Sequence, residues 1–475
     1  MNINKTARLC TIFLTFLTVS ACTTVGPDYR VPSAAEVNNP AALGNFKGSG
    51  EAPFSQAPLP AHWWHLYQDP VLDGLIAKAF AANTDLRIAS ANLARARSVQ
   101  REFEDASRPE VGVNAAPAYG KPSAVAMGLG ERIPNSWLYD TGVRVSYQVD
   151  LFGKIARSIE ASRADTQATE AALDMTRVTI AAETANAYAD ICGVGQQLLI
   201  AQKSVDIQQK FVQLTEDRVR TGRGTAFDIS RVKSQLEQLK AALPTLQAQQ
   251  KLGQYRLEAL LGGLPGSLPE AVAHCGKPLK IDSPIPTGDG AALLKRRPDI
   301  RQAERRLAVA TARIGVATAD LYPSISLGMT AGSTGELAQF GAENAGRWSI
   351  GPLISWTLPS TGTARSRIAQ AEASTDAELA RFDGVVLNAL RETESSLTVY
   401  ARELDRNAAL QAARDQSELA AEQARTLYRY GRTDFLTTLD ADRTLASQES
   451  VLAASNTKLI SDQVTLFLSL GGGWE

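Results

Sequence analysis

Apolar residues recur every seven positions along much of the chain and predict long paired helices. In the second half the repeating residues are Leu445, Leu452, Leu459 and Leu466. Apolar residues spaced three and four apart also run from Ile229 to Leu260. A seven-residue repeat places one apolar stripe along a helix, against which a second helix packs. The chain is therefore expected to be mainly helical, with helices paired along their length.

A second set of stripes lies upstream of each paired helix. From about Lys154 to Arg220 the first stripe comprises Ile191, Leu198, Val205, Val212 and Val219. If this run were one helix, it would be ~100 Å long at a rise of 1.5 Å per residue. Such a length suits a protein that crosses an aqueous compartment between two membranes. Pro244 lies inside the following helix and is expected to kink it or to remove one backbone hydrogen bond.

Between the shorter and longer helices of each half, the apolar period changes to two, which predicts β-strands. The first alternating set is Val143, Val145, Tyr147, Val149 and Leu151. The second set alternates less cleanly and comprises Ile350, Pro352, Ile354, Trp356 and Leu358. With the strands that precede them, these sets predict two hairpins, at about 110–152 and 323–358.

Each such strand is long enough to cross a membrane at a tilt, and nearby aromatic residues would lie at the membrane interfaces. These aromatics are Trp137, Tyr139, Tyr147, Trp348 and Trp356. Four strands cannot close a barrel, and open strand edges are not tolerated in lipid. Three copies would supply twelve strands, so a membrane location predicts a homotrimer. Four ordinary strands packed on a soluble core remain the alternative.

An internal duplication organises the body of the chain. An offset of 209 matches Tyr147 with Trp356, Gly153 with Gly362, Arg220 with Arg429, Gly222 with Gly431, and Gly262 with Gly471. Upstream an offset of 214 matches Asp85 with Asp299, Arg87 with Arg301, Leu93 with Leu307, and Pro109 with Pro323. The difference of five residues is expected in a surface loop between Pro109 and Tyr147. We therefore expect one repeat over 62–262 and a second over 290–475, joined by a linker over 263–289. Each repeat would consist of a helix, a β-hairpin and a helical hairpin, the last at about 154–262 and 362–470.

The first residues have the pattern of an export signal. Lys5 and Arg8 precede an apolar run over 9–17, which is too short for a permanent membrane span and is followed by small residues up to Cys22. Residues 1–21 are therefore expected to be a signal peptide. The next segment, 22–61, is rich in Pro, Ala, Gly and Asn without periodicity, and it predicts an extended tether.

Composition and charge exclude several classes of function. The 475 residues include 49 Lys and Arg against 50 Asp and Glu, so the excess of basic residues typical of a nucleic-acid-binding protein is missing. Three His and four Cys are too few to suggest a zinc or haem site, and no nucleophile-base constellation stands out. We expect no enzyme, no metal and no cofactor. Cys192 and Cys275 could form a disulfide in an oxidising compartment, or they could remain apart.

Six short motifs in order resemble one protein family. They are the residues around Cys22, Gly26-Pro27-Asp28-Tyr29, Trp63-Trp64 with Asp69-Pro70-Val71-Leu72, Asp150-Leu151-Phe152-Gly153-Lys154, Arg297-Pro298-Asp299-Ile300, and Tyr322-Pro323. Together they resemble the NodT/OprM-type outer-membrane efflux lipoproteins of the TolC superfamily. The resemblance implies a trimeric channel with a shared 12-stranded barrel in the outer membrane, a periplasmic barrel of helical coiled coils, and an equatorial region. Residues 359–362 depart from the usual turn of that family.

The resemblance also implies particular residues and partners. Cys22 would carry the covalent lipid, and Thr23 beside it indicates an outer-membrane destination. Independently of the resemblance, the helical hairpins are expected to turn at Gly222 and Gly431, because glycine allows the left-handed backbone that such a turn needs. Asp228, Tyr428 and Asp440 match, by motif position, the residues that narrow the periplasmic end of the channel.

The function expected from the resemblance is passive export of drugs or toxic compounds through the outer-membrane duct of a tripartite, RND-type efflux pump. Its partners would be a periplasmic adaptor (membrane fusion) protein, an inner-membrane transporter and outer-membrane lipid. A type I protein-secretion duct and a periplasmic coiled-coil scaffold lipoprotein without a pore are the alternatives. The sequence does not identify the exported compounds.

Overall fold

The computed structural model describes residues 24–50, 53–121, 134–281, 283–356 and 361–472, together with 123, 125, 128 and 130. The expected signal peptide, Cys22 and residues 359–360 lie outside this part of the chain. Contacts divide the chain into two compact units, each built from three separate segments. The first unit comprises 1–32, 92–170 and 302–382, and the second comprises 33–91, 171–301 and 383–475.

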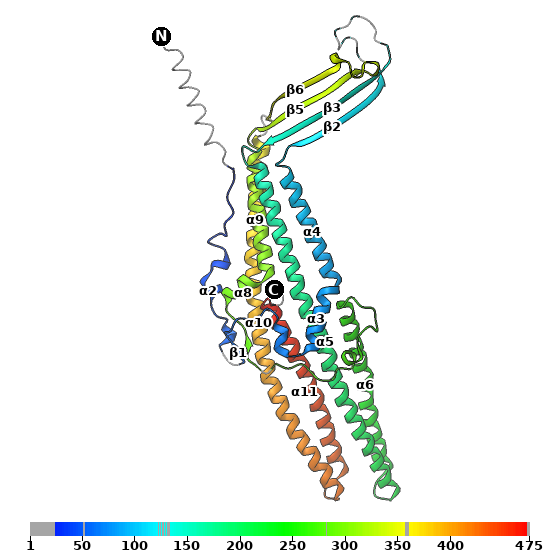
Figure 1. The fold of residues 1–475 in the computed structure, drawn as a ribbon. Coiled ribbons are helices and arrows are strands. Elements are labelled where there is room, and N and C mark those ends of the chain that lie inside the picture. The colour runs from blue at the N-terminus through cyan, green and yellow to red at the C-terminus, as the bar shows by residue number, and fades with distance from the viewer. Residues whose placement is uncertain are drawn as a thin grey trace. The chain divides into compact units, whose positions relative to one another are not determined.

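The first unit contains a four-stranded antiparallel sheet (Figure 1). Its strands are β2 (Glu110–Gly120), β3 (Ser136–Val149), β5 (Ser324–Glu336) and β6 (Gly346–Ser355), in that spatial order. β3 and β5 extend further toward the loops than the alternating pattern predicted, because their small and polar residues there also join the hydrogen-bonded ladder. Leu151 and Trp356, which the pattern placed in strands, follow the ends of β3 and β6, and Leu358 lies outside the described residues. β2 and β6 form the two edges of the sheet.

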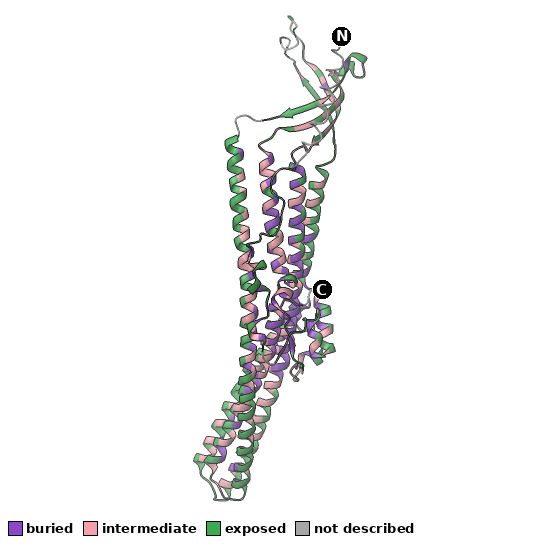
Figure 2. Ribbon diagram, turned by 90° about the vertical axis from the view of Figure 1, so that its left-hand side faces the viewer, coloured by how far each residue is buried: buried purple, intermediate pink, exposed green. Residues whose placement is uncertain are grey.

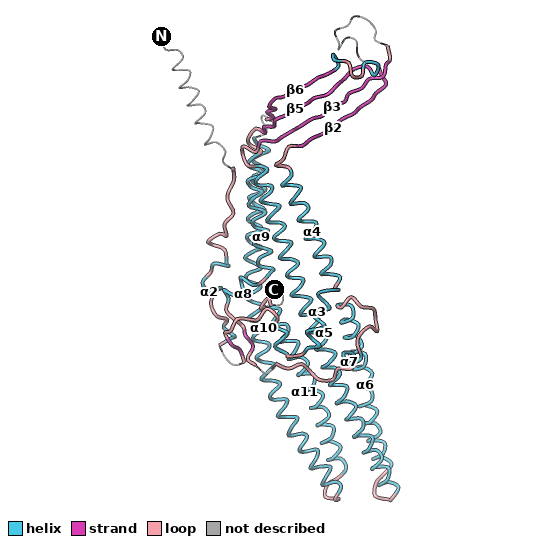
Figure 3. The backbone as a smooth tube through the Cα atoms, in the orientation of Figure 1, coloured by secondary structure: helices cyan, strands magenta, loops and turns pink. Residues whose placement is uncertain are grey.

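Long helices follow and precede these strands (Figure 3). α4 (Thr84–Asp105) leads into β2, and α9 (Pro298–Ala319) leads into β5. α5 (Lys154–Arg220) and α10 (Thr361–Arg429) follow the hairpins, with 67 and 69 residues, so the long run expected from the stripes is one helix. Each is followed by a 35-residue helix, α6 (Ala226–Leu260) and α11 (Phe435–Ser469). Pro244 lies within α6, and the helix continues through it.

Shorter elements complete the second unit. They are α2 (Pro40–Leu43), β1 (Phe54–Ser55), a 3₁₀ turn (Trp63–Tyr67), α3 (Pro70–Ala82), α7 (Glu270–Ala273), β4 (Ile285–Pro286) and α8 (Gly290–Arg296). Trp63 is fully buried and stacks on Phe467 at 4.7 Å between ring centroids. The structure joins Cys192 of α5 to Cys275 of the inter-repeat linker by a disulfide. None of the helices in the described part of the chain is both long enough and apolar enough to cross a membrane.

The N-terminal segment expected to be a tether is bonded to the body along its length. In the first unit, the guanidinium of Arg157 donates to the backbone oxygens of Val25 and Gly26 at 3.1 Å each, and to Asp28 at 2.8 Å. A Cβ on Gly315 would lie 2.9 Å from the Val25 oxygen, so only glycine allows this close approach. In the second unit, β1 pairs with β4. The segment is therefore a docked strap, because its exposed backbone groups find partners on the body.

The duplication holds at the level of individual hydrogen-bonded pairs. In the first hairpin Glu110 pairs with Ser146, and in the second Ser324 pairs with Ser355. Adding 214 to residue 110 and 209 to residue 146 gives 324 and 355, so the two hairpins share one register. The two offsets read from the sequence therefore describe equivalent positions in space.

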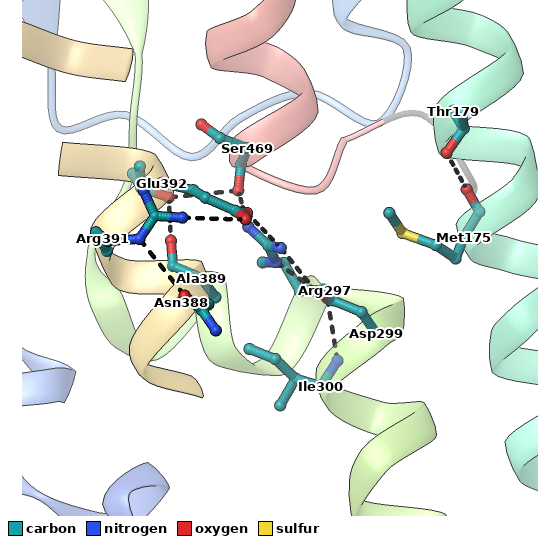
Figure 4. A network of polar contacts seen from close by, with 11 residues as sticks. Met175, Thr179, Arg297, Asp299, Ile300, Asn388, Ala389, Arg391, Glu392 and Ser469 are labelled. Atoms are coloured by element: carbon teal, nitrogen blue, oxygen red, sulfur yellow. Dashed lines mark hydrogen bonds and ion pairs between the residues drawn. The ribbon is translucent and has the colours of Figure 1, made fainter. Parts of the chain in front are cut away.

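The same equivalence appears where each repeat ends, and Figure 4 shows the end of the second repeat. The guanidinium of Arg297 donates to the backbone oxygen of Ser469 at 2.9 Å, near the end of α11. It also binds Asp299 and Glu392. In the first repeat the side chain of Asn83 donates to the backbone oxygen of Leu260, at the end of α6, at 3.1 Å. Asn83 is equivalent to Arg297 by the offset of 214, so both repeats satisfy an unpaired helix-terminal carbonyl from the equivalent residue.

Candidate functional site

The two faces of the sheet differ in polarity. Because paired residues share a face and neighbours along a strand alternate, the register assigns every side chain to one face. One face is apolar and carries Val111, Val113, Val143, Val145, Tyr147, Ile325, Leu327, Met329, Trp348, Ile350, Pro352 and Ile354. The other face is mainly polar and carries Gly112, Asn114, Arg144, Ser146, Gln148, Ser326, Thr330 and Ser349, with Ala116, Ala118, Leu138 and Leu353 as its apolar residues.

Within the described part of the chain most of the apolar face is uncovered, apart from Tyr139, which is 4 % exposed and packs on Phe340. Val113, Ile350 and Trp348 are each more than 70 % exposed. An apolar surface of this size is unusual on a water-soluble protein, where large contiguous patches mark contact with a partner or a membrane. The pattern of one lipid-like and one water-like face along every strand is typical of a membrane barrel wall.

Aromatic rings lie at both ends of the apolar face. At the loop ends of the strands, Tyr119 packs on Trp137 at 5.5 Å, and Tyr139 packs on Phe340 at 4.9 Å. At the helix ends, Phe152 stacks on Tyr322 at 4.4 Å. Two aromatic zones bounding an apolar band correspond to the two interfaces of a membrane. Trp137 and Tyr139 belong to the five aromatics that the sequence assigned to the interfaces, whereas Phe340 was missed because it follows the strand in a loop. An interfacial position of Tyr147, Trp348 and Trp356 stays a prediction.

A polar cavity of about 370 Å³ lies where strands and helices meet in the first unit. Asp320 accepts hydrogen bonds there from Lys154 at 2.6 Å and from Arg367 at 3.1 Å. Asp150 accepts from the backbone N–H groups of Ile155 and Ala156 and so caps the start of α5. Lys154 and Arg367 are therefore paired with Asp320, and Asp150 is bound by backbone N–H groups, so each charged residue that lines the cavity has a hydrogen-bond partner.

The helical hairpins turn at the glycines expected from the sequence. Gly222 has φ +73° and Gly431 has φ +71°, a conformation that glycine adopts without steric cost. Figure 2 shows that these turns are exposed. Just inside them, Phe211 stacks on Phe435 at 5.3 Å and also contacts Tyr428. These rings tie the two hairpins of one chain to each other.

The structure brings two of the three candidate gate residues near the same cation. The guanidinium of Arg218 lies 4.3 Å from the ring centroid of Tyr428. Burial raises the pKa of the Tyr428 hydroxyl; the charge of Arg218 opposes that rise, and the charge of Asp228 adds to it. Arg218 was not among the sequence candidates, although its position four residues before Gly222 places it in the last turn of α5.

Asp228 has a local structural role. Its carboxylate accepts hydrogen bonds from the backbone N–H and the hydroxyl of Thr225, and Thr225 caps the start of α6 in return. These hydrogen bonds lower the pKa of the Asp228 carboxyl. The backbone oxygen of Asp440 accepts a hydrogen bond from the hydroxyl of Thr444, one turn further along α11. A gating role for Asp228, Tyr428 and Asp440 therefore stays a prediction.

Equivalent positions of the two hairpins carry ion pairs of opposite polarity. In the second hairpin Arg425 of α10 binds Asp442 of α11 at 2.8 Å. The equivalent residues of the first hairpin are Glu216 of α5 and Lys233 of α6, also 2.8 Å apart. The two hairpins thus keep an ion pair at the same place, but the acidic residue is on the first helix of one hairpin and on the second helix of the other.

The geometry described so far agrees with the comparisons to known proteins. The family model "Outer membrane efflux protein" matches residues 75–263 and 291–472, one match for each repeat. The chain belongs to the outer membrane efflux protein family. The solved outer-membrane channel OprN is 36 % identical, with a TM-score of 0.87 over 95 % of this chain and 100 % of that one. The TolC-like channel fold and its internal duplication are therefore confirmed.

Curated relatives match over almost the whole chain. The "toluene efflux pump outer membrane protein TtgC" of Pseudomonas putida is 27 % identical over 99 % of this chain and 96 % of its own. The "probable outer membrane lipoprotein SilC" of Salmonella typhimurium is 26 % identical over 99 % of both chains. The expected outer-membrane location and efflux role are confirmed at the level of the family. These relatives are named as membrane and efflux proteins rather than as enzymes.

The described residues offer no candidate metal site. Within the described residues no three His, Cys, Asp or Glu side chains gather closely enough to hold a metal ion. His65 lies 3.5 Å from Asp73 and beside Trp64, consistent with a packing role for these residues.

Proposed function

We propose that three copies of this chain form the passive outer-membrane duct of a tripartite efflux pump. The supporting observation is the sheet, whose apolar face is bounded by aromatic zones while its other face is polar. Four such strands leave the edges β2 and β6 unpaired, and open edges are costly in lipid, so closure requires further copies. In a closed barrel the apolar face would meet lipid, and the polar face would line a water-filled passage.

The partners follow from the passive nature of the duct. A water-filled passage supplies no energy, so an inner-membrane transporter would drive export, joined to the duct by a periplasmic adaptor protein. Drugs, solvents and toxic ions are the proposed cargo classes, since relatives are named for toluene, antibiotic and cation efflux. No catalytic step and no bound cofactor are needed.

We further propose that Cys22 carries the lipid anchor. Thr24 is two residues after Cys22 in the sequence, and a Cβ on Gly153 would lie 2.4 Å from the Thr24 side chain, so Thr24 packs closely where β3 leads into α5. Two or more acyl chains on Cys22 would give stable anchoring. Mass spectrometry of the mature N-terminal peptide tests this proposal, and an unmodified cysteine would contradict it.

The deciding experiment is the conductance of detergent-purified mature protein in a planar bilayer, with its mass determined in parallel. Discrete channels from a trimer are expected. A water-soluble monomer without conductance would contradict the duct and favour a scaffold. A trimer that stays closed leads to the gate test, in which Asp228→Ala and Asp440→Ala are expected to raise conductance; unchanged conductance in both would exclude these residues as the gate.

A further inference from the structure

We propose that a belt of two segments restrains the long helices α5 and α10 at one level and so limits opening of the duct at the hairpin turns. The belt consists of the described residues 36–48 and 53–57 of the strap and 266–276 and 285–288 of the linker, and the disulfide between Cys192 and Cys275 closes it. This inference rests on the proposed duct and adds which residues restrain its hairpins. All of these residues belong to the second unit.

The strap half of the belt is fixed to α10 by two carboxylates. Asp383 accepts a hydrogen bond from the backbone N–H of Glu36 at 2.9 Å. Glu394 accepts from the backbone N–H groups of Lys47 and Gly48 at 2.7 and 3.1 Å. Residues eleven apart are about three helical turns apart, so both carboxylates lie on one face of α10. Hydrogen bonds to ionised groups are among the stronger ones, so they hold the strap along that face.

The linker half is attached covalently to α5. The disulfide joins Cys275 of the linker to Cys192, which is fully buried in the helix packing. A Cβ on Gly195 would lie 1.9 Å from the backbone oxygen of Cys275, so only glycine allows the linker to lie this close to the helix. The linker therefore rests on the surface of α5 at a single defined level.

The same half of the belt is also bound to α6. The carboxylate of Glu258, 3 % exposed, accepts hydrogen bonds from the backbone N–H groups of Gly266 and Leu268 at 2.8 and 3.2 Å. One turn earlier in α6, the side chain of Gln254 donates to the backbone oxygen of Ala273 at 2.8 Å. The linker thus bridges both helices of the first hairpin.

A short parallel ladder joins the two halves of the belt. β1 of the strap pairs with β4 of the linker. The backbone N–H groups of Ile285 and Thr287 donate to the backbone oxygens of Pro53 and Ser55 at 2.9 Å each. Ile285 is 1 % exposed and Thr287 is fully buried, so water does not compete for these hydrogen bonds. The belt therefore connects α10 to α5 through a series of contacts that includes one covalent bond.

The two long helices are held by different halves of the belt. The offset of 209 converts Cys192 into Ala401 and Gly195 into Leu404, so α10 lacks both residues that attach the linker to α5. A leucine side chain would fill the space in which the linker approaches α5. Because the linker holds α5 and the strap holds α10, the belt limits how far the two helices can separate at this level.

Movement at the level of the belt is transmitted to the hairpin turns. α5 and α10 run unbroken from the belt toward the turns at Gly222 and Gly431. The helix rises ~45 Å between Cys192 and Gly222 at 1.5 Å per residue, so a tilt of about 5° at the belt displaces the turn by about 4 Å. A belt that prevents such a tilt therefore restricts the aperture that the turns would surround.

Reduction of the assembled trimer tests the belt without affecting folding. Dithiothreitol exchanges its thiols with the disulfide, so the reagent becomes a cyclic disulfide while Cys192 and Cys275 become thiols. The conductance of trimers in a planar bilayer should then rise several-fold, and alkylation followed by mass spectrometry measures the fraction reduced. Trimers of Cys192→Ser with Cys275→Ser should conduct at the raised level from the outset and should not respond to the reagent. Unchanged conductance of fully reduced trimers would overturn the inference.

Two single substitutions test the contacts on each half of the belt. Gly195→Ala should displace the linker from α5, and Glu394→Ala should release the strap from α10 while leaving the disulfide intact, so each should raise the conductance. The matched control is Gly384→Ala in α10, where a Cβ would have no atom within 4 Å and the conductance should not change. If both test variants conduct as the control does, the belt does not restrain the hairpins.

The mass of the protein separates this inference from the proposed function. A conducting trimer whose conductance is the same after every change in the belt would overturn the inference and leave the duct intact. Trimers that stay closed in all variants would also overturn it, because release of the belt should open them. A monomer without conductance, in the unmodified protein and in every variant, would overturn both the belt and the duct.

Discussion

Replacing Arg297 by alanine should weaken the junction at the end of the second repeat. The guanidinium, 7 % exposed, binds the backbone oxygen of Ser469 and the carboxylates of Asp299 and Glu392 (Figure 4). The Ser469 oxygen keeps one other donor, the hydroxyl of Thr393 at 3.3 Å. The carboxylates of Asp299 and Glu392 are 24 % and 43 % exposed, so water replaces part of what they lose.

These contacts set the size of the effect. A hydrogen bond to a charged group contributes ~1.5–3 kcal/mol, and partial exposure reduces the two carboxylate contacts to the lower end or below. The aliphatic stem of the buried arginine adds packing that alanine cannot replace. We expect a loss of about 3 kcal/mol in the free energy of unfolding. If the contacts break in the unfolding transition state, unfolding should be on the order of 100-fold faster.

The assay is the rate at which helical circular dichroism is lost at fixed denaturant and temperature, with the protein in detergent. Arg297→Asn is the informative control, because Asn83 performs the same capping in the first repeat. This variant should unfold more slowly than Arg297→Ala. An alanine variant within twofold of the unmodified protein would refute the network's role, and equal rates for the two variants would refute the equivalence of the repeats.

Three further predictions concern other contacts. Arg157→Ala should leave trimer formation intact but make the peptide bonds of residues 24–32 susceptible to protease, as followed by mass spectrometry; continued protection would show that the strap docks without the arginine. Cys192→Ser with Cys275→Ser should speed thermal unfolding, since the disulfide ties the linker to α5; addition of reductant should then affect only the unmodified protein. Burial raises the pKa of the Asp442 carboxyl, opposed by Arg425, so the folded state holds its proton more tightly. The free energy of unfolding should therefore fall as the pH rises from about 4 through the raised pKa. Unfolding rates measured over a series of pH values test this, and the increase of the rate with pH should be absent in Asp442→Asn.

Local patterns in the sequence predicted the elements that depend on local spacing. The seven-residue stripes predicted the long run that forms α5. The glycines that follow the stripes predicted the turns at Gly222 and Gly431. The period of two gave all four strands, although not their full length. These features follow from which residues face a neighbouring helix or strand, and the sequence carries that information directly.

Contacts between segments that are distant in the sequence could not be predicted from such local patterns. The strap has no periodicity, so its docking on Arg157 depends on glycines brought together only by the fold. The sequence could not decide whether Cys192 and Cys275 form a disulfide, because their spacing along the chain does not fix the distance between them in space. Asp228 matched a gate motif by position, yet its hydrogen bonds with Thr225 are those of a helix cap. The motif match therefore did not reveal the capping role of Asp228, and its gating role stays a prediction.

The ion pairs of opposite polarity near the hairpin turns have a consequence for the symmetry of assembly. In a trimer six hairpins would surround the passage, alternating between the Glu216–Lys233 type and the Arg425–Asp442 type. A partner that approached along the threefold axis could take two rotational positions, one-sixth of a turn apart. Backbone similarity alone makes these positions equal, but the exchanged signs give them different electrostatic energies. The duct itself would then select the rotational position of its partner.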